Sequence, residues 1–475
     1  MISVTLCLIN KRKDMQKVLI ANRGEIAVRI IRACHDLGLQ TVAVYSQADT
    51  EALHVLHADE AICIGEAPSA RSYLRVPHIL SAAEITGADA IHPGYGFLSE
   101  NSKFASICES CGLNFIGPAP QAIALLGDKA KAKEVAKKAG CPVIPGSDGV
   151  VSNLQDALEE AKKIGFPVFI KAVAGGGGKG IRIAHSEDEF AKLFVAARTE
   201  AEASFSNPDV YLEKMIMNPR HIEIQIMGDK FGNYVHLGER DCTIQRRRQK
   251  LIEEAPSPVL SAKLRQKMGQ AAINIAKEAD YHSVGTVEFL LDRDHNFYFM
   301  EVNTRVQVEH TVTEMLTGVD IVNMQIRIAR GEKLPFEQKD IEFKGHAIQF
   351  RINAEDPSHN FAPSPGRLEY YVPPGGPHVR VDSACYSGYS IPPNYDSMIA
   401  KLIVTGDDRT IALARSKRSL QEFHIGGVKT TIPFHLDMIG HGAFISANFD
   451  LGYVDGLVAN GHTFGPPHAH EPETK

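Results

Sequence analysis

Short apolar runs alternate with stretches of helical periodicity along the first hundred residues. Lys17 to Ala21 predicts a buried strand, and Glu25 to Leu37 carries apolar residues three and four positions apart, which predicts a helix. Gly38 supplies a helix stop, and Gln40 to Tyr45 predicts a second strand. This strand–helix–strand order indicates a parallel sheet with helices on its faces.

The pattern changes further along the chain. The segment from about 143 to 215 predicts a small α/β insert, and strands dominate from residue 216 onward. After Gly345 the chain again shows short β segments separated by Pro and Gly turns. The elements predicted in these parts are helices at 121–139, 154–164 and 410–423 and strands at 166–172, 222–227, 234–237, 284–291 and 296–303.

A glycine-rich loop, Gly175 to Gly180, joins two predicted strands. A dinucleotide-binding loop requires a helix next, and a P-loop requires Ser or Thr after its lysine; neither follows here. Glycines at a hairpin tip let backbone N–H groups approach phosphate oxygens, and Lys171 and Lys179 add positive charge. We therefore expect a phosphate-binding lid, with a merely flexible linker as the alternative.

Two apolar segments flank a polar turn at 292–296 and predict an antiparallel hairpin. If the turn centres between its third and fourth residues, Glu288 faces Glu301 and Thr286 faces Asn303. Cross-strand neighbours lie roughly 5 Å apart, and two carboxylates that close repel unless a cation or proton lies between them. Hard oxygen ligands favour Mg²⁺ or Mn²⁺. The alternative is a solvated strand face.

The chain continues as Thr304-Arg-Val-Gln-Val-Glu-His310. If this segment is extended, Arg305, Gln307 and Glu309 share one face. A cation, an amide and a carboxylate together would form a small-anion pocket with a base, in which Arg305 orients Glu309 and an oxyanion. The same spacing is also compatible with a surface strand.

Composition narrows the function classes. The 475 residues are 44% apolar and 23% charged, which is ordinary globular composition. The net charge of −6, and the lack of aromatics in the basic cluster at 239–250, argue against a nucleic-acid partner. No apolar run reaches the roughly 20 residues of a membrane span. Eight scattered cysteines and no secretory signal favour a cytoplasmic location. The tail from Gly465, with His468 and His470, is expected to be a disordered, solvated end.

Six segments in series resemble the biotin carboxylase family, from about Met15 to about Leu457. They are Ile20-Ala-Asn-Arg-Gly-Glu-Ile-Ala27, His92-Pro-Gly-Tyr-Gly-Phe-Leu-Ser-Glu-Asn101, the glycine-rich loop, Gln245-Arg-Arg-Arg-Gln-Lys250, Glu301-Val-Asn-Thr-Arg-Val-Gln-Val-Glu-His310 and Arg351-Ile-Asn-Ala-Glu-Asp-Pro357.

The resemblance implies an ATP-grasp fold of mixed α/β and α+β class. The expected parts are an extension or mis-assigned start at 1–14, a Rossmann-like N-terminal domain at 15–127, an ATP-grasp domain at 128–340 with a mobile lid at about 143–215, a β-rich C-terminal domain at 341–460, and a disordered tail at 461–475.

The resemblance also implies residue roles. Contacts to ATP would come from Lys129, Lys171, Gly177, Gly178, Glu213, Lys214, Met215, Ile216, His221, Arg248, Glu288 and Glu301. The metal ligands would be Glu288, Glu301 and Asn303. The bicarbonate site would be Lys250, Arg305, Gln307 and the backbone of Val308. Glu309 would be the base, and Arg351 would stabilise the biotin enolate. Many family members carry His at the position of Arg248. Because Arg also binds phosphate, we expect a slight effect on nucleotide affinity.

The implied activity is ATP- and bicarbonate-dependent carboxylation of biotin through carboxyphosphate, with two Mg²⁺ or Mn²⁺ ions. The sequence has no Met-Lys-Met biotin attachment tripeptide. We therefore expect biotin on a separate carboxyl carrier protein, carboxyltransferase subunits as further partners, and a homodimer. This arrangement favours acetyl-CoA carboxylase and fatty acid synthesis. The alternatives are a component of a pyruvate or propionyl-CoA carboxylase, another ATP-grasp ligase such as a carbamoyl-phosphate synthetase half, and a non-catalytic nucleotide sensor.

Overall fold

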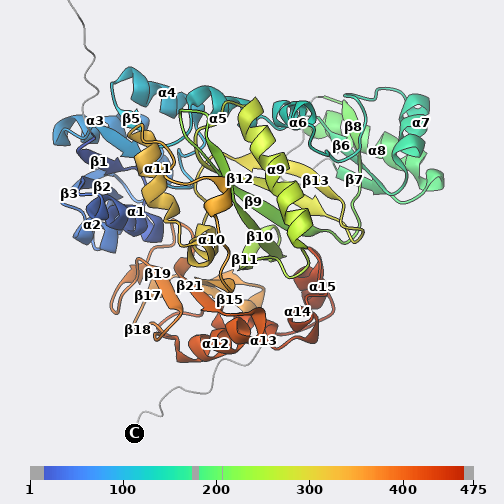
Figure 1. Cartoon of the computed structure of the whole chain (residues 1–475). Coiled ribbons are helices and arrows are strands. Elements are labelled where there is room, and N and C mark those ends of the chain that lie inside the picture. The colour runs from blue at the N-terminus through green and yellow to red at the C-terminus, as the bar shows by residue number, and fades with distance from the viewer. Residues whose placement is uncertain (1–14, 174–180, 206, 465–475) are drawn as a thin grey trace, which may run out of the picture.

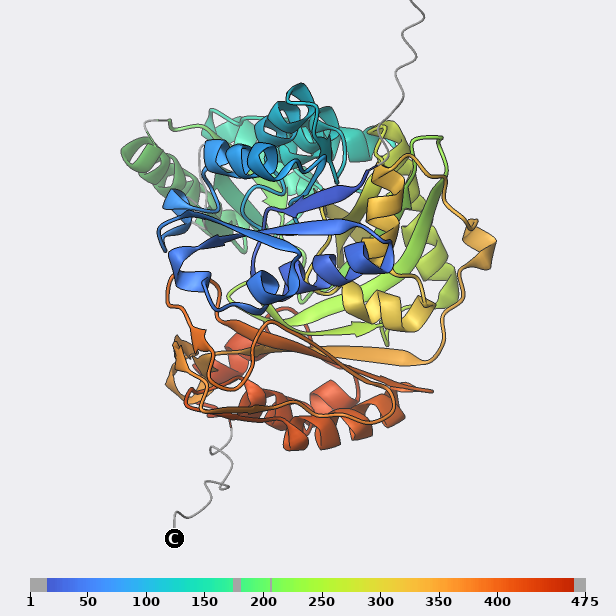
Figure 2. The same ribbon diagram turned by 90° about the vertical axis from the view of Figure 1, so that its left-hand side faces the viewer.

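A computed structural model describes residues 15–173, 181–205 and 207–464 (Figure 1). The N-terminal part is a parallel sheet in the order β3-β2-β1-β4-β5. Helices lie on both sides of its strands (Figure 2), which confirms the predicted strand–helix–strand start. The elements are β1 (Lys17–Ile20), α1 (Gly24–Asp36), β2 (Gln40–Ser46), α2 (Leu53–His57), β3 (Glu60–Gly65), α3 (Val76–Thr86), β4 (Ala90–His92), α4 (Ser102–Ser110) and β5 (Asn114–Phe115).

The predicted insert is a small sheet with two helices and its own apolar core. Strand β6 pairs antiparallel with β7, as the sequence predicts, and with β8. Its core includes Ile170, Phe190 and Phe194. The loop that carries Gly177 and Gly178 lies outside the described residues. The elements of this part and of the connector before it are α5 (Pro120–Gly127), α6 (Lys129–Lys138), α7 (Leu154–Ile164), β6 (Val168–Ala172), β7 (Ile181–Ala184), α8 (Glu187–Phe205) and β8 (Val210–Lys214).

An antiparallel sheet forms the centre of the molecule, in the order β13-β12-β9-β10-β11-β14-β21-β19. Because β11 pairs with β14, the sheet runs without a break from the middle of the chain into its C-terminal part. Three helices interrupt the region that the sequence predicts as strand-dominated. The elements are β9 (Arg220–Gly228), β10 (Tyr234–Arg246), β11 (Gln249–Ala255), α9 (Ala262–Glu278), β12 (Ser283–Leu291), β13 (Phe297–Asn303), α10 (His310–Thr317) and α11 (Ile321–Ala329).

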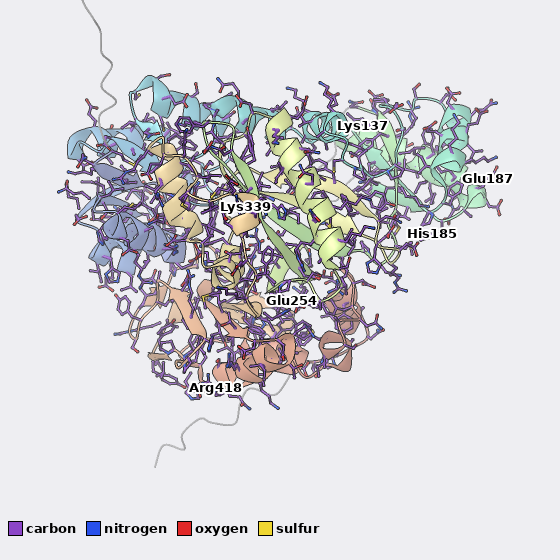
Figure 3. All side chains as sticks on the ribbon, viewed as in Figure 1. Lys137, His185, Glu187, Glu254, Lys339 and Arg418 are labelled. Carbon is purple, nitrogen blue, oxygen red and sulfur yellow. The ribbon has the colours of Figure 1, made fainter. Side chains whose placement is uncertain are left out.

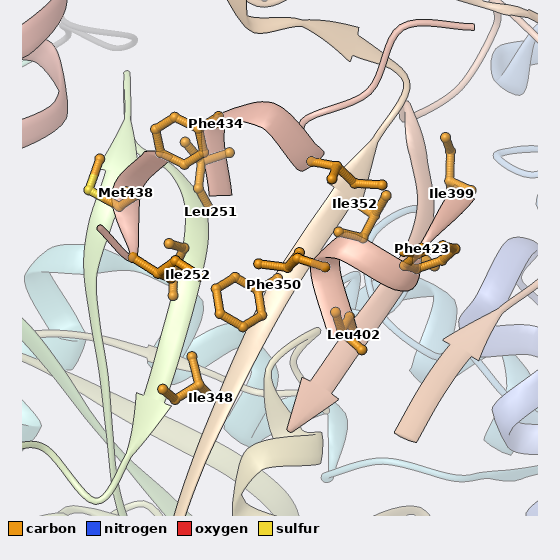
Figure 4. Packing of buried hydrophobic residues seen from close by; sticks show 14 of the residues in the cluster. Leu251, Ile252, Ile348, Phe350, Ile352, Ile399, Leu402, Phe423, Phe434 and Met438 are labelled. Carbon is orange, nitrogen blue, oxygen red and sulfur yellow. The ribbon is translucent and has the colours of Figure 1, made fainter. Parts of the chain in front are cut away.

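The C-terminal part adds three strands to this sheet and covers them with helices. Phe350, Ile352 and Leu402 project from the strands toward Phe434 and Phe423 (Figure 4). The elements are β14 (His346–Asn353), β15 (Glu355–Asp356), β16 (Ala362–Pro363), β17 (Gly366–Arg367), β18 (Tyr370–Val372), β19 (Val379–Ser383), β20 (Ser390–Ile391), β21 (Met398–Gly406), α12 (Arg409–Glu422), β22 (His424–Gly426), α13 (Ile432–Met438), α14 (Gly442–Ile445) and α15 (Tyr453–Ala459).

Charged side chains lie both at the rim and inside the molecule. Figure 3 shows Glu187 and Arg418 at the periphery and Glu254 at the junction of the central sheet with the C-terminal helices. Glu254 is buried, so its charge requires partners within the protein. Within the described ranges, no helix has both the length and the apolar character needed to cross a membrane.

Candidate active site

The predicted carboxylate hairpin is present with the predicted register. Thr286 faces Asn303 and Glu288 faces Glu301 on β12 and β13. The register shifts by one residue between Glu288 and Phe289, so the pairs nearer the turn differ from the simple projection. A bulge of this kind bends the strand locally and re-aims side chains. Here it lies next to the carboxylate pair.

Lys250 is the cation around which the site is built. Its Nζ lies 2.7 Å from Oε2 of Glu223, 3.0 Å from Oε1 of Glu288 and 2.6 Å from Oε1 of Glu309. Burial opposes the charge on Lys250, but the three carboxylates outweigh burial and hold the pKa of this ammonium well above its usual value. Lys250 is therefore charged, and it is shared among three carboxylates.

Arg240 is the fully buried cation of the site. It faces Glu223 across β10 and β9, and its guanidinium forms an ion pair with that carboxylate. It also donates hydrogen bonds to Oε1 of Gln225 at 2.6 Å and to Oε1 of Gln307 at 2.8 Å. From the sequence, Arg240 is only one residue of a basic cluster. Its role cannot be predicted there, because its partners are distant in the sequence and lie on other elements.

Glu309 begins α10 as its N-terminal cap residue. Its second carboxylate oxygen lies 2.9 Å from the guanidinium of Arg351 on β14, which also forms an ion pair with Glu253 at 2.5 Å. Burial alone would raise the pKa of Glu309, but Lys250 and Arg351 lower it below its ordinary value. Glu309 is therefore ionised, as a proton acceptor must be.

The segment between β13 and α10 contains a bend at Arg305 and a turn at Val308 and Glu309, so it is neither the extended segment that was considered nor a surface strand. Gln307 nevertheless reaches the site and donates to Oε1 of Glu288 at 2.9 Å. Arg305 points elsewhere: its guanidinium donates to Glu100 and to Oδ1 of Asn303, each at 3.0 Å. The expected orientation of Glu309 by Arg305 is therefore not seen among the described contacts, where Lys250 and Arg351 hold this carboxylate.

A second buried lysine fixes the backbone beside the site. Lys401 on β21 is fully buried; its Nζ lies 3.0 Å from Oε2 of Glu25 and donates to the carbonyl of Val308 at 3.1 Å. Glu25 also accepts a 2.5 Å hydrogen bond from the hydroxyl of Tyr95. The sequence motifs contain Glu25 and Tyr95 but do not reveal that they meet Lys401.

The donor set suits a hard divalent cation. Glu288 accepts from Asn303 at 2.9 Å and lies 2.9 Å from Nε2 of His221. Glu301, its cross-strand neighbour, is 39% exposed, so its carboxylate is open to solvent. The buried cluster holds more carboxylates than cations: Glu223, Glu253, Glu288 and Glu309 against Arg240, Lys250 and Arg351. This negative excess, with carboxylate and amide oxygens, fits Mg²⁺ or Mn²⁺.

The candidate nucleotide residues lie on β8 and around it. Lys171 on β6 forms an ion pair with Glu213 on β8, and Nζ of Lys133 lies 3.5 Å from the same carboxylate. At the end of β8, Lys214 donates to the carbonyls of Gly165 and Phe166 at 2.7 and 2.8 Å. Lys214 thus connects the end of β8 to the loop that precedes β6.

The remaining nucleotide candidates lie after β8 and at the start of α6. Met215 and Ile216 follow β8, and the N–H of Met215 donates to the carbonyl of Pro167 at 3.0 Å. Lys129, at the start of α6, is 86% exposed, and its Nζ lies 3.6 Å from Glu301. A long exposed lysine beside an exposed glutamate is free to move toward a polyanion.

Arg248 lies at the two-residue turn between β10 and β11. Both turn residues, Arg247 and Arg248, have positive φ, 47° and 69°. Such turns favour Asn and Gly, because a side chain clashes in the left-handed region. Arg248 is exposed beside the strand that carries Lys250. The basic cluster is therefore a hairpin whose strands are buried and whose tip is a strained pair of arginines.

Three family models match consecutive parts of the chain. The biotin carboxylase N-terminal domain matches residues 14–123, the carbamoyl-phosphate synthase L chain ATP-binding domain matches 128–337, and the biotin carboxylase C-terminal domain matches 349–456. The matched ranges follow one another through all of the sheets described above.

Relatives resemble the chain over nearly its whole length. It is 59% identical to a biotin carboxylase from a Nostoc species over 92% of this chain and 98% of that protein. It is 53% identical to a pyruvate carboxylase subunit of Methanothermobacter thermautotrophicus over 92% of this chain and 89% of that protein. It also resembles a crystal structure of the Hydrogenobacter thermophilus 2-oxoglutarate carboxylase biotin carboxylase domain dimer with MgADP, ADP and bicarbonate. That match has a TM-score of 0.86 and 50% identity, and covers 96% of this chain and 100% of the other.

Proposed function

Because this chain belongs to the biotin carboxylase family of ATP-dependent ligases, we propose that it uses ATP and bicarbonate to carboxylate biotin on a separate carrier protein. The observation that carries this proposal is the sharing of Glu309 between Lys250 and Arg351. One carboxylate thereby joins the proposed bicarbonate site to the proposed biotin site.

The charge cluster supports the first step. An oxygen of bicarbonate attacks the γ-phosphorus of ATP, and the bond between this phosphorus and the oxygen that leaves with ADP breaks. Glu309 takes the proton of bicarbonate. Glu288, Glu301 and Asn303 would hold the Mg²⁺ or Mn²⁺ that neutralises phosphate charge. Lys250, with Gln307 and Arg305, would hold the bicarbonate. Arg305 must then turn from Glu100, and its 21% side-chain exposure allows this.

Arg351 supports the second step. Carboxyphosphate breaks down to CO₂ and phosphate, the phosphate takes the proton from the biotin ureido nitrogen, and that nitrogen attacks CO₂. A guanidinium beside the reacting ureido group stabilises the negative charge that develops on its oxygen. Glu309 and Glu253 pair with this guanidinium in the structure. Incoming anions would compete with Glu309 for its two cations and so raise its proton affinity.

The nucleotide residues would act in ATP positioning. We assign phosphate contacts to Lys129, Lys171 and Arg248, and to Gly177 and Gly178, which are outside the described ranges. His221 would make a further contact to the nucleotide. The strand edge at 213–216 would hold the adenine. Ion pairing of Lys171 with Glu213 and the exposure of Lys129 support this, since both lysines can exchange a carboxylate partner for phosphate.

The acyl partner and assembly are proposed from the relatives. We propose a role in acetyl-CoA carboxylase together with carboxyltransferase subunits. The Methanothermobacter pyruvate carboxylase subunit supports pyruvate carboxylase as the second candidate. A domain dimer in a similar structure supports a homodimer. We propose domain boundaries near 127 and 340, with the lid at about 143–215. The free thiols of the described residues suit the cytoplasm.

The test is bicarbonate-dependent release of ADP by the purified chain with Mg²⁺, with and without free biotin. Stimulation by biotin that Arg351→Ala removes would support the assignment. Arg409→Ala is the matched control, because Arg409 also pairs with a buried glutamate of β11 but on the other face. ATP binding without biotin-stimulated turnover would contradict biotin carboxylation and favour a nucleotide sensor. Addition of each candidate carrier and carboxyltransferase then identifies the acyl acceptor.

A further inference from the structure

Three potential metal ligands converge among the C-terminal helices, outside the active site. Asp437 lies in the last turn of α13, His441 precedes α14, and His462 follows α15. One ligand atom from each lies within 4.8 Å of the other two. The residues come from three separate elements, which lie together in the C-terminal part of the molecule (Figure 1). Sequence spacing alone links only Asp437 and His441, one helical turn apart.

Two of the three distances match those of a tetrahedral site. With zinc–ligand bonds of about 2.0–2.1 Å, neighbouring ligand atoms lie roughly 3.3 Å apart and two bound imidazoles have centroids roughly 5 Å apart. Nε2 of His441 lies 3.3 Å from Oδ2 of Asp437, and Nε2 of His462 lies 2.6 Å from the same oxygen. The two imidazole centroids are 5.0 Å apart. A small outward shift of His462 would complete the geometry.

The surroundings allow one imidazole to take the required form. Nδ1 of His441 lies 3.0 Å from the hydroxyl of Tyr453, so the ring can donate there and leave Nε2 unprotonated toward Asp437. Metal-bound histidines usually donate their second ring nitrogen in this way. The backbone of His462 is anchored by a 3.0 Å hydrogen bond to Leu457, and Phe464 beyond it is buried.

We propose that Asp437, His441 and His462 bind a divalent transition metal, with Zn²⁺ as the best fit to two imidazoles and one carboxylate. A solvent molecule would take the fourth position, because the three side chains are between 19% and 33% exposed and an ion can enter from solvent. The ion would fasten the ends of α13 and α15 to the start of α14. This role is structural, and it does not depend on the proposed function.

Helix α15 connects the proposed metal site to the basic hairpin of β10 and β11. Asp455 on α15 accepts a hydrogen bond from the N–H of Arg247 at 3.4 Å, and the N–H of Leu451 donates to Pro219 beside β9 at 2.9 Å. Fastening α15 would therefore also hold the segment that contacts the turn between β10 and β11. The expected consequence is greater thermal stability of the C-terminal part when Zn²⁺ is present.

The test is calorimetric titration of the 475-residue chain with Zn²⁺ in excess Mg²⁺. His468→Ala and His470→Ala are included throughout, so that the tail histidines cannot bind the metal. We expect His441→Ala and His462→Ala each to remove one equivalent of bound Zn²⁺ per chain, and Tyr453→Phe to weaken that equivalent roughly tenfold. Binding of Zn²⁺ to the carboxylates of the active site is common to all variants and cancels in the comparison.

The matched control is His359→Ala, which removes an exposed histidine that lies 2.8 Å from Asp356. It should leave the Zn²⁺ stoichiometry unchanged. Each variant should keep the circular dichroism spectrum and ATP cleavage of the parent, which separates loss of the metal from loss of the fold. If His441→Ala and His462→Ala bind as much Zn²⁺ as the parent, or if Zn²⁺ does not raise the melting temperature of the parent, the cluster is an ordinary His–Asp charge network and the proposal is wrong.

Discussion

Two neighbouring glutamates on β11, Glu253 and Glu254, are both buried but point to different networks. Burial alone raises the pKa of either carboxyl. At Glu254 the hydrogen bond from His346 and the charge of Arg409 outweigh burial and lower the pKa. At Glu253 Arg351 acts in the same direction, but burial and the negative charge of Glu309 keep the pKa above its ordinary value.

The difference shows how a site is distinguished from a structural ion pair. Glu254 has two cationic or donor partners to itself, at 2.8 Å from His346 and 2.7 Å from Arg409. Glu253 shares Arg351 with Glu309, which in turn shares Lys250 with two further glutamates. A network in which each buried carboxylate has its own cationic partner contributes mainly to the stability of the fold. A network short of cations retains affinity for a metal ion, and its shared cations are available to anionic substrates.

Glu309→Gln should show the largest effect on activity. Replacement by Gln keeps the shape but removes the proposed base, so we expect kcat for biotin-stimulated ADP release to fall by about 10²–10⁴-fold. Some stability should also be lost, because the lowered pKa of Glu309 means that its charge favours the folded state, while Lys250 and Arg351 each keep another carboxylate partner. Measurement of kcat, KM and urea unfolding on one preparation checks both parts. A variant with normal kcat would exclude Glu309 as the base.

Glu254→Gln should show the opposite pattern. Loss of its charge leaves Arg409 without its carboxylate, and breaking a buried pair costs about 3–5 kcal/mol. Glu253→Gln is the matched comparison and should cost less, because Arg351 keeps Glu309 and the raised pKa of Glu253 means that its charge favours the folded state less. Denaturant unfolding of the two variants side by side measures the difference. Equal destabilisation would mean that the two networks are energetically alike.

These two networks also mark what the sequence can predict. The hairpin of β12 and β13 is accessible from the sequence, because its alternation and turn are local, and the register of Glu288 with Glu301 is confirmed. The register shift after Glu288 cannot be predicted in this way, because the alternation of apolar and polar residues does not mark the extra residue on β13. For hairpin β10–β11 the sequence indicates only a basic cluster, because a strand containing Arg240 looks solvated until its partners are known.

The candidate residues follow the same rule. Family resemblance places Lys250 and Glu309 in one bicarbonate-activating site, and the structure brings them together with Arg351. Glu223 and Glu253 escape sequence-based prediction, because nothing local distinguishes them from surface glutamates. Arg305 lies at Glu100 instead of Glu309, since the chain turns into α10 where an extended segment was considered.

Helix α13, which contacts the backbone of Arg351, offers a pH test of the site network. His435 is buried, its Nε2 lies 2.8 Å from the carbonyl of Arg351, and burial lowers its pKa from 6.5 to about 4. The unfolded chain therefore binds this proton more readily. The stabilisation from neutral His435, about 3 kcal/mol, is complete above pH 6.5 and is lost as the pH falls through 4.

The measurement is the free energy of unfolding of wild type and His435→Gln between pH 7 and 4. Gln can still donate to the carbonyl of Arg351 but does not titrate. We expect the wild type to lose about 3 kcal/mol more than the variant across this window. Parallel curves for the two proteins would show that His435 does not contribute to the acid sensitivity.

The strained turn should give the smallest effect. Arg248→Gly removes a side chain from a residue at φ 69°, so we expect a gain in stability of about 1 kcal/mol. If Arg248 contacts ATP phosphates, the same change raises the KM for ATP, whereas Arg248→His should largely preserve it. Thermal unfolding and ATP saturation curves separate the two effects. A stabilised Arg248→Gly variant with an unchanged KM for ATP would show that the turn is strained but does not contact the nucleotide. The turn would then differ from the charge cluster that begins two residues later at Lys250, whose cations are shared among several carboxylates.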